Sequence, residues 1–358
     1  MFVESIAALR KAYPDATIEA VIPRHGPIEE LIGNLAIVRT GGVWVIRKRH
    51  LAQLLALSFI TLPLSIFHAA RSFFRSDIVY INTAVIINYW LVARLFPRKT
   101  IGHVHEIPVG RAASVLGWLV RFSKAAVLFN SQASAGHFCL GALRKAYVIH
   151  NGYAGPVEAS PPSYDGSRPL RIGMLGRINR WKGQDLLIEA ISRLPSEARQ
   201  KLHLRIAGNS FEGATHEDKL RDLVAARNLN DIAEFTGFVA DPRPIFAWAD
   251  VVAVPSRLPE PFGLVAIEAM AHARPVIAAA HGGLLEIVED GQTGWLFAAN
   301  DTQALARCLS EAIGNPDAVQ ARGIAGRARF ETSFSADAYQ ANFAAVFEQI
   351  SGLKQTAA

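Results

Sequence analysis

Apolar residues in the second half of the chain fall into short runs that alternate with helical patterns. Branched residues dominate the runs, and they predict buried strands: LRIGML (170–175), LHLRIAG (202–208), AEFTGF (233–238), DVVAVPS (250–256) and PVIAAA (275–280). Between them, apolar residues recur with a helical period over 182–194, 216–229, 242–249 and 263–273. This alternation predicts a parallel sheet that is covered by helices on both faces.

The first half repeats this alternation more loosely, with short predicted strands over 17–24, 77–83, 99–106, 125–131 and 145–151. The intervening segment 153–169 is rich in Pro, Gly and Ser and has little periodicity, which is typical of a linker. We therefore expect two Rossmann-like α/β domains with doubly wound sheets. The expected boundaries are an N-terminal domain over 1–155, a linker over 156–169, a second domain over 170–334, and a C-terminal helix over 335–358 that packs back on the first domain.

The run LAQLLALSFITLPLSIF (51–67) has no charged residue, and its length borders on that of a membrane span. Polar residues and Pro63 interrupt it, and basic residues flank both of its ends. We expect a core helix first, a membrane-surface helix second and a transmembrane span third. The basic flanks add weight to the second reading without changing this order, because Lys and Arg are attracted to anionic head groups.

Composition narrows the possible classes of protein. The chain has 358 residues, of which 51% are apolar, so two folded domains are expected and general disorder is excluded. Its two cysteines, Cys139 and Cys308, have no Cys or His neighbour at metal spacing, which argues against zinc and against a disulfide framework. The N-terminus lacks the features of a secretory signal.

Charge is distributed unevenly between the two halves. Residues 1–150 contain 17 Lys and Arg against 7 Asp and Glu, whereas the remainder contains 20 against 24. A membrane surface, a polyanionic acceptor or a nucleic acid would suit the basic half, and a solvated surface without a partner is an equal alternative. Nucleic-acid binding would require aromatic residues interleaved with the basic ones in a recognisable module, and no such module is found, so no nucleic-acid partner is expected.

The segment GRINRWKG (176–183) follows a predicted strand and leads into a predicted helix. Gly176 would let the backbone turn tightly, and Arg177 and Lys182 would flank the positive end of the helix dipole. A diphosphate would find two cations and a helix terminus there, whereas the alternative is two solvated cations on a loop. The glycine fingerprint of nicotinamide dehydrogenases is absent.

Two carboxylates stand eight residues apart in SRLPEPFGLVAIEAM (256–270). Glu260 lies in the loop after a strand, where it could bind sugar hydroxyls, and Gly263 opens the next helix. Glu268 lies about two turns into that helix, where an unpaired carboxylate requires hydrogen-bond donors. The alternatives are an exposed loop charge for Glu260 and a buried Arg partner for Glu268. Gly282 and Gly283 follow another strand and either admit a ligand or form a plain loop.

Taken together, these motifs closely resemble glycosyltransferase family 4, retaining enzymes with the GT-B fold, in which two Rossmann-like domains face a central cleft. The resemblance covers about residues 170–300 and rests mainly on EPFGLVAIEAMAHARPVIA (260–278). It implies that Arg177 and Lys182 hold the donor diphosphate, that Glu260 contacts the transferred sugar and that Glu268 contacts the ribose. The other donor-binding candidates are Gly176, Phe262, Gly263, Leu264, Gly282 and Gly283.

The first half resembles the family's acceptor domain more weakly. In GHVHEIP (102–108), the resemblance makes His105 the candidate that faces the sugar, with Glu106 orienting it and His103 as the alternative. Asn130 and Ser131 are expected to cap a helix. Family members usually begin with a strand and a Gly-rich loop, whereas this chain begins inside what resembles the following helix. A start placed too far downstream and a real truncation both fit this departure.

The resemblance implies a retaining glycosyltransferase that moves a hexose from a nucleotide diphosphosugar to an acceptor hydroxyl, with Arg177, Lys182, His105 and Glu260 as catalytic residues. We expect no metal and no further cofactor, a glycan or lipid-linked acceptor in polysaccharide assembly, and a cytoplasmic protein that is peripheral on an anionic membrane through residues 43–76. The alternative is a non-catalytic GT-B-like partner subunit. A nucleotide-sugar epimerase fits the spacing of the two carboxylates less well. Base, sugar, linkage and oligomeric state stay open.

Overall fold

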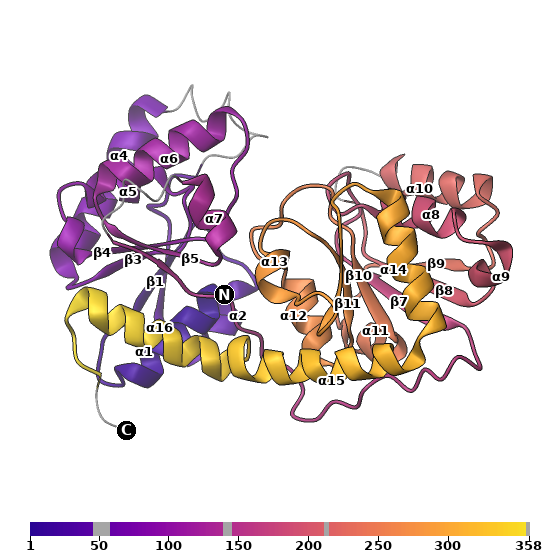
Figure 1. The fold of residues 1–358 in the computed structure, drawn as a ribbon. Coiled ribbons are helices and arrows are strands. Elements are labelled where there is room, and N and C mark those ends of the chain that lie inside the picture. The colour runs from indigo at the N-terminus through magenta and orange to yellow at the C-terminus, as the bar shows by residue number, and fades with distance from the viewer. Residues whose placement is uncertain (46–57, 139–144, 211–214, 356–358) are drawn as a thin grey trace. The chain divides into compact units, whose positions relative to one another are not determined.

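A computed structural model describes residues 1–45, 58–138, 145–210 and 215–355 (Figure 1). The chain divides into two compact units. Unit 1 comprises Met1–Gly152 and Ala336–Ala358, and unit 2 comprises Tyr153–Ser335. Each unit is an α/β domain whose strands are all parallel within its sheets.

Unit 1 contains a two-stranded sheet, in the order β1-β2, and a separate four-stranded sheet, in the order β3-β4-β5-β6. Its strands are β1 Glu19–Ile22, β2 Ile37–Thr40, β3 Val79–Ile81, β4 Thr100–Val104, β5 Ala126–Phe129 and β6 Ala146–Val148. Its helices are α1 Phe2–Ala12, α2 Ile28–Ile32, η1 Gly33–Leu35, α4 Ser58–Arg75, α5 Ile87–Ala93, η3 Pro97–Lys99, α6 Arg111–Ser123, α7 Gln132–His137 and α16 Ala336–Ser351. The short strand β2 was not predicted from the sequence.

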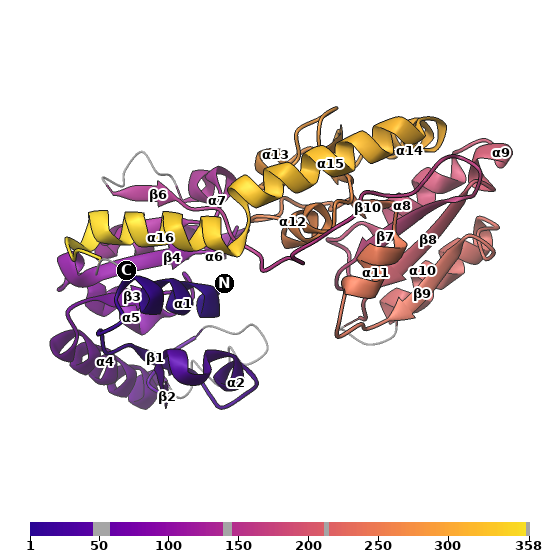
Figure 2. The same cartoon turned by 90° about the horizontal axis from the view of Figure 1, so that it is seen from below.

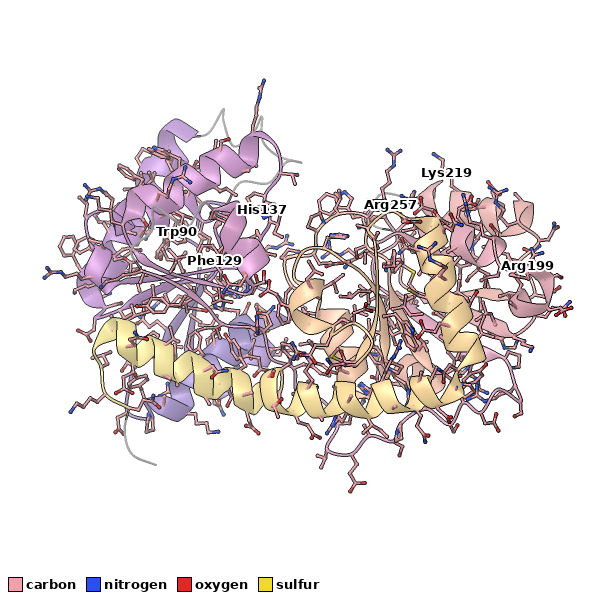
Figure 3. All side chains as sticks on the ribbon, in the orientation of Figure 1. Trp90, Phe129, His137, Arg199, Lys219 and Arg257 are labelled. Carbon is pink, nitrogen blue, oxygen red and sulfur yellow. The ribbon has the colours of Figure 1, made fainter. Side chains whose placement is uncertain are left out.

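Alternate residues of β5 pack into two different cores, because successive side chains of a strand point to opposite faces. Val127 and Phe129 join the core that includes α4, α5 and α6, whereas Leu128 joins the core that includes α1 and α16. Trp90 of α5 is fully buried in the first core, and Figure 3 shows it near Phe129. A Cβ on Gly102 would lie 2.1 Å from the Trp90 ring, so the strand needs glycine there.

Unit 2 contains one six-stranded sheet in the order β12-β11-β10-β7-β8-β9. Its strands are β7 Leu170–Leu175, β8 Leu202–Ala207, β9 Ala233–Gly237, β10 Val251–Val254, β11 Val276–Ala279 and β12 Gly294–Phe297. Its helices are α8 Gln184–Ser192, α9 Ser196–Arg199, α10 Thr215–Ala226, α11 Arg243–Trp248, α12 Leu264–Ala271, α13 Leu284–Ile287, α14 Thr302–Gly314 and α15 Pro316–Ser333. The five predicted strands of this half are confirmed, and β12 was missed.

The two faces of this sheet are covered by different helices, as Figure 2 shows for α15 and α10. Val251 and Ala253 of β10 pack into the core that includes α8, α10 and α14. Val252 and Val254 pack into the other core, which includes α11, α12 and α15. This alternation explains why the strands appear in the sequence as continuous apolar runs.

The structure differs from the sequence-based prediction at the linker. The boundary between the units follows Gly152, and the segment expected as the linker over 156–169 belongs to unit 2. Tyr164 is buried there, and its hydroxyl donates a hydrogen bond to the Ile313 carbonyl at 2.8 Å. The Pro- and Gly-rich composition therefore reflects an irregular segment that packs on unit 2.

Helix α16 packs against α1 within unit 1. Tyr339 of α16 is buried, and its hydroxyl lies 2.7 Å from the Ser5 hydroxyl of α1. The apolar run over 51–67 lies partly outside the described residues, and its remainder forms the start of α4. Within the described ranges, no helix has both the length and the hydrophobicity needed to cross a membrane.

Candidate active site

The loop after β7 is held in place by close backbone approaches that require glycine. A Cβ on Gly208, which has a φ of +149°, would lie 1.9 Å from the Gly176 carbonyl oxygen. A Cβ on Gly183, with a φ of +77°, would lie 2.0 Å from the Pro255 carbonyl oxygen. The ends of β7, β8 and β10 therefore meet at one edge, and Gly183 caps α8 there, as the sequence predicted within one or two residues.

Lys182 and Glu260 form an ion pair at this edge. The Lys182 ammonium donates to Glu260 Oε1 at 2.6 Å, and the two side chains are 27% and 15% exposed. The Ser256 hydroxyl donates to the same oxygen at 2.5 Å. The alternative of an exposed loop charge for Glu260 is therefore wrong, and the loops after β7 and β10 are joined through this carboxylate.

The pairing leaves donors and an acceptor for a ligand. An ammonium group has three N–H donors, and Glu260 takes one of them. Both hydrogen bonds to the Glu260 carboxylate end on Oε1, so Oε2 accepts none from the described residues. The site can thus offer cationic donors to an anion and a carboxylate oxygen to a hydroxyl.

Glu268 lies on α12 and is partly buried. Its carboxylate forms no hydrogen bond or ion pair among the described residues, so the structure gives no support to the alternative of a buried Arg partner. Burial raises the pKa of the Glu268 carboxyl above its usual range, more than the nearby Lys182 ammonium lowers it. A carboxylate in this setting lacks the donors that its charge requires, which a diol would supply.

The paired glycines support the Glu260 loop directly. The Gly283 N–H donates to the Glu260 carbonyl at 2.9 Å, and a Cβ on Gly282 would lie 2.5 Å from that same carbonyl oxygen. Of the two alternatives that the sequence left open, the plain loop fits Gly283, because its N–H is already bonded within the protein. A contact of this kind, between loops that are far apart in the sequence, cannot be predicted from the local sequence.

The remaining donor-binding candidates lie around the start of α12. Phe262 is buried, Gly263 caps the helix with a φ of +120°, and Leu264 is 43% exposed. A Cβ on Gly263 would lie 2.7 Å from a Leu284 methyl group, so glycine lets α13 approach. The first N–H groups of α12 have no acceptor within the helix and can bind a ligand.

Two arginines stand at the same edge with different surroundings. Arg177 is exposed and follows Gly176 directly, and its carbonyl accepts a hydrogen bond from the Gln184 side chain at 3.0 Å. Arg257, which Figure 3 labels, pairs with Asp185 of α8 at 2.8 Å. The sequence did not single out Arg257, because its partner lies 72 residues away.

In unit 1, His105 and His103 belong to one buried polar network. His105 Nε2 lies 3.0 Å from Asn82 Oδ1, and its ring centroid lies 4.0 Å from that of His103. Burial lowers the pKa of His105 to about 4, with a further contribution from the chain's N-terminal amine. His105 Nδ1 and His103 Nε2 are buried without a hydrogen-bond partner among the described residues.

The expected role of Glu106 as the orienting group for His105 is wrong. The Glu106 carboxylate accepts from Thr83 Oγ1 and from the backbone N–H groups of Ala84 and His105, and it does not contact the imidazole. Asn82 orients the ring instead, and Tyr80 Oη donates to the same Asn82 oxygen at 3.1 Å. Asn82 follows β3 directly, and residues at neighbouring strand ends are a signal that could have indicated it.

Ser131 caps α7, as predicted, and accepts a hydrogen bond from the Ser134 N–H at 2.9 Å. Asn130 precedes the cap residue and does not cap the helix itself. Its Oδ1 accepts a hydrogen bond from the Ser134 hydroxyl. Both residues are buried and complete the local hydrogen bonding of the helix start. They therefore have a structural role in unit 1.

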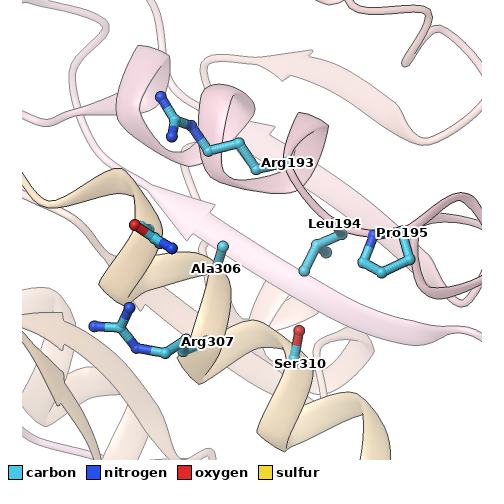
Figure 4. A pocket seen from close by; sticks show the side chains of 7 residues that line it. Arg193, Leu194, Pro195, Ala306, Arg307 and Ser310 are labelled. Carbon is cyan, nitrogen blue, oxygen red and sulfur yellow. The ribbon is translucent and has the colours of Figure 1, made fainter.

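A separate pocket of about 450 Å³ opens between the end of α8 and one side of α14 (Figure 4). Its lining residues are Arg193, Leu194, Pro195, Gln303, Ala306, Arg307 and Ser310. None of the predicted site residues is among them. The ion pair at Lys182 lies before the start of α8, whereas Arg193 lies at its end, roughly 14 Å along the helix. The pocket is thus distinct from the candidate site.

Residues 163–329 match the family model described as glycosyl transferases group 1. D-inositol 3-phosphate glycosyltransferase from Streptomyces coelicolor is 38% identical over 179 residues, which are 48% of this chain and 38% of that protein. The lipopolysaccharide core biosynthesis mannosyltransferase LpcC from Rhizobium leguminosarum is 29% identical over 181 residues, 51% of each chain. The match therefore spans about two fifths to one half of these relatives.

Solved structures resemble nearly the whole chain. HepE from Anabaena, in complex with UDP, has a TM-score of 0.80 at 24% identity, covering 98% of this chain and 96% of that one. Sucrose-phosphate synthase from Thermosynechococcus elongatus has a TM-score of 0.70 at 23% identity, covering 97% and 91%. At these identities the likeness shows the fold, and it confirms the predicted α/β class and GT-B architecture.

Proposed function

We propose that this chain is a retaining glycosyltransferase of family 4 that transfers a hexose from a nucleotide diphosphosugar to an acceptor hydroxyl. The observation that carries the proposal is the cluster of Lys182, Glu260 and Glu268 at the carboxyl edge of the sheet in unit 2. The family match over 163–329 covers all three residues. Ligands of parallel α/β sheets bind at this edge.

Each group has a part in the proposed reaction. The Lys182 ammonium, Arg177 and the start of α8 would meet the negative charge that grows on the departing diphosphate, and so favour the transition state. The free Oε2 of Glu260 would accept a hydroxyl of the transferred sugar. Glu268 would accept two hydrogen bonds from the ribose diol, which would satisfy its unpaired carboxylate.

The stereochemical outcome follows from the same groups. The departing phosphate oxygen would take the acceptor proton on the face from which it leaves, so the anomeric configuration is retained. Such a reaction needs no carboxylate pair of the glycosidase type. His105, with a pKa of about 4, would act as a neutral hydrogen-bond partner of the sugar near pH 7.

The nature of the substrates is inferred from the relatives. HepE structures contain UDP and UDP-glucose, and LpcC is a mannosyltransferase of lipopolysaccharide core biosynthesis. We propose UDP-glucose as the first donor to test, and a lipid-linked glycan or growing polysaccharide as the acceptor. The protein would act in the cytoplasm, peripheral on the membrane, and without a metal ion.

The test is a thermal-shift screen of the chain against UDP, GDP and ADP sugars, followed by measurement of nucleotide release. A donor that raises the melting temperature and is turned over, with EDTA present, supports the proposal. A chain that binds no nucleotide diphosphosugar overturns it. Binding without turnover on any glycan acceptor would favour a non-catalytic subunit instead.

A further inference from the structure

The exposed face of α4 carries apolar side chains where a solvated helix would carry polar ones. Ile60, Leu64, Phe67 and Phe74 are 73%, 56%, 62% and 74% exposed. Their spacing of four, three and seven residues places them on one stripe of the helix. Phe73, on the other side, is fully buried, so α4 is apolar on both sides.

A second exposed apolar stripe lies on α6. Trp118 is 52% exposed and stacks on Phe122, with their ring centroids 4.9 Å apart. Helix α5 contacts both α4 and α6, so the three helices form one layer of unit 1 (Figure 1). Such exposed apolar surface on one layer is typical of an interaction site.

The segment after α5 connects the two stripes. Phe96 contacts the Phe74 ring edge-on at 5.2 Å, and the Arg94 guanidinium lies 5.7 Å from the centre of the Phe122 ring. Leu95, between them, is 76% exposed. The exposed apolar side chains of the two helices are together called the α4–α6 patch, which consists of Ile60, Leu64, Phe67, Phe74, Trp118 and Phe122.

The sequence around this patch is almost free of acidic residues. Residues 31–157 contain 14 Lys and Arg but only two acids, Asp77 and Glu106. Glu106 is partly buried, and its carboxylate is bonded within the protein. Arg71 and Arg75 are exposed on α4, and Arg98 is exposed beyond α5. Asp77 is exposed and Glu19 lies near Arg75, but the basic residues outnumber these acids, so the rim of this apolar surface is predominantly basic and complementary to an anionic bilayer.

We propose that the α4–α6 patch docks unit 1 on a bilayer that contains anionic phospholipids. The aromatic and aliphatic side chains would enter the head-group region, and the arginines would contact lipid phosphates. This inference extends the membrane association included in the proposed function, by naming the side chains of α4 and α6 that form the docking surface. It is carried by unit 1 alone and does not depend on sugar transfer.

A second copy of this chain suits the patch less well. Two copies meeting through it would bring their arginines together with only Asp77 and Glu19 near them, and Glu19 is already paired with Arg39. A soluble polyanion would contact the arginines but would leave Phe74 and Leu95 exposed. A bilayer accommodates both the charge and the apolar side chains.

The test is co-sedimentation of the full chain with vesicles of phosphatidylcholine alone, or of equal parts of phosphatidylcholine and phosphatidylglycerol. We expect the chain to bind the anionic vesicles at least roughly tenfold more strongly, with binding weakened by salt. Equal binding to both vesicles, or binding to neither, would overturn the proposal.

A double variant, Phe74→Ser with Trp118→Ser, should lose at least about tenfold in vesicle binding, because each substitution removes a large apolar side chain from the bilayer. The matched control is Val157→Ser with Ile324→Ser, which removes exposed apolar side chains from unit 2 and should bind as the parent does. Circular dichroism melting shows whether each variant folds. A separate variant, Arg71→Gln with Arg75→Gln, should weaken binding to anionic vesicles only.

Three further measurements distinguish the possible occupants and the two proposals. Light scattering without lipid should show the same mass for parent and patch variant, whereas a dimer lost in the variant would overturn bilayer docking. Soluble heparin that binds as tightly as the vesicles, and equally to the patch variant, would also overturn it. Nucleotide-sugar binding should be unchanged in the variant, so loss of vesicle binding alone leaves the proposed function intact.

Discussion

Both units carry a polar cluster where neighbouring parallel strands end, but the clusters differ in charge and in pairing. In unit 2, Lys182 and Glu260 are charged and partly exposed, and the Lys182 ammonium donates a short hydrogen bond to the Glu260 carboxylate. In unit 1, His103 is buried and His105 is partly buried, both are neutral near pH 7, and their hydrogen bonds go to Tyr80 and Asn82. The difference indicates that unit 2 is built to meet a charged ligand, whereas the unit 1 cluster can contribute only neutral hydrogen bonds near pH 7.

The largest effect should come from removing the cation of unit 2. We expect Lys182→Ala to lower kcat/KM for the donor by roughly a hundredfold or more, because the charge that meets the leaving diphosphate is lost. Steady-state release of the nucleotide measures it. Lys219→Ala, at an exposed position of α10, is the matched control and should keep parental rates. Near-normal turnover of the Lys182 variant would contradict the assignment.

The neutral cluster of unit 1 should appear in the pH dependence of stability. His105 has a folded pKa of about 4 against an ordinary value near 6.5, so its stabilising contribution is complete above pH 6.5. That contribution is lost as the pH falls from 6.5 towards 4, and at pH 5 the loss is about 2 kcal/mol.

The variant His105→Gln cannot titrate, so its free energy of unfolding should fall less between pH 7 and pH 5 than that of the parent. Urea unfolding at the two pH values measures the difference. Lys219→Ala, at an exposed position of α10, serves as the comparison in unit 2 and should follow the parental pH dependence. Identical slopes for the parent and the His105 variant would show that the ring is not held neutral by burial.

A smaller effect, with opposite signs in two measurements, is expected at Glu268. Burial raises its pKa, so the ionised carboxylate costs stability at neutral pH, and this cost disappears as the pH falls below the ordinary value for a glutamate. Glu268→Gln should therefore raise the melting temperature at pH 7, with no gain in acid. Donor affinity should fall about tenfold, because charged hydrogen bonds to the ribose are weakened.

Calorimetric titration with the donor's nucleoside diphosphate, together with thermal melting, tests both signs for Glu268. A variant that is less stable at pH 7 would mean that the carboxylate has a partner within the protein. Unchanged affinity would mean that the ribose lies elsewhere. Either result would remove Glu268 from the site.

The smallest change should follow from Ser256, which supports Glu260 but is not its only donor. Ser256→Ala should lower kcat about fivefold with little change in KM, because one hydrogen bond of about 1 kcal/mol is lost while Lys182 still holds the carboxylate. Ser256→Thr keeps the hydroxyl and should restore most of the rate. An alanine variant as slow as Lys182→Ala would mean that the hydroxyl acts on the substrate itself.

The same contrast explains what could be predicted from the sequence. Five of the six strands of unit 2 follow from local periodicity. The helices that begin at Gln184 and Leu264 follow from periodicity and from the glycines at their starts, and both helix starts were predicted within one or two residues. Lys182 and Glu260 were expected at one edge because strand ends of a parallel sheet meet there. The fold class followed from the same alternation.

Contacts between distant segments could not be predicted in this way. The hydrogen bond from Gly283 to Glu260 joins two loops that follow different strands. The segment 156–169 has the composition of a linker, yet Tyr164 anchors it to α14 through a residue 149 positions away. Composition and local spacing carry no information about such partners.

The most direct test of the account is a crystal structure of this chain with UDP bound. The account predicts that the diphosphate lies within hydrogen-bond distance of Lys182 Nζ and that the ribose hydroxyls contact the Glu268 carboxylate, beside the start of α12. A nucleotide bound elsewhere, for example between Arg193 and Arg307 in the pocket beside α14, would contradict it.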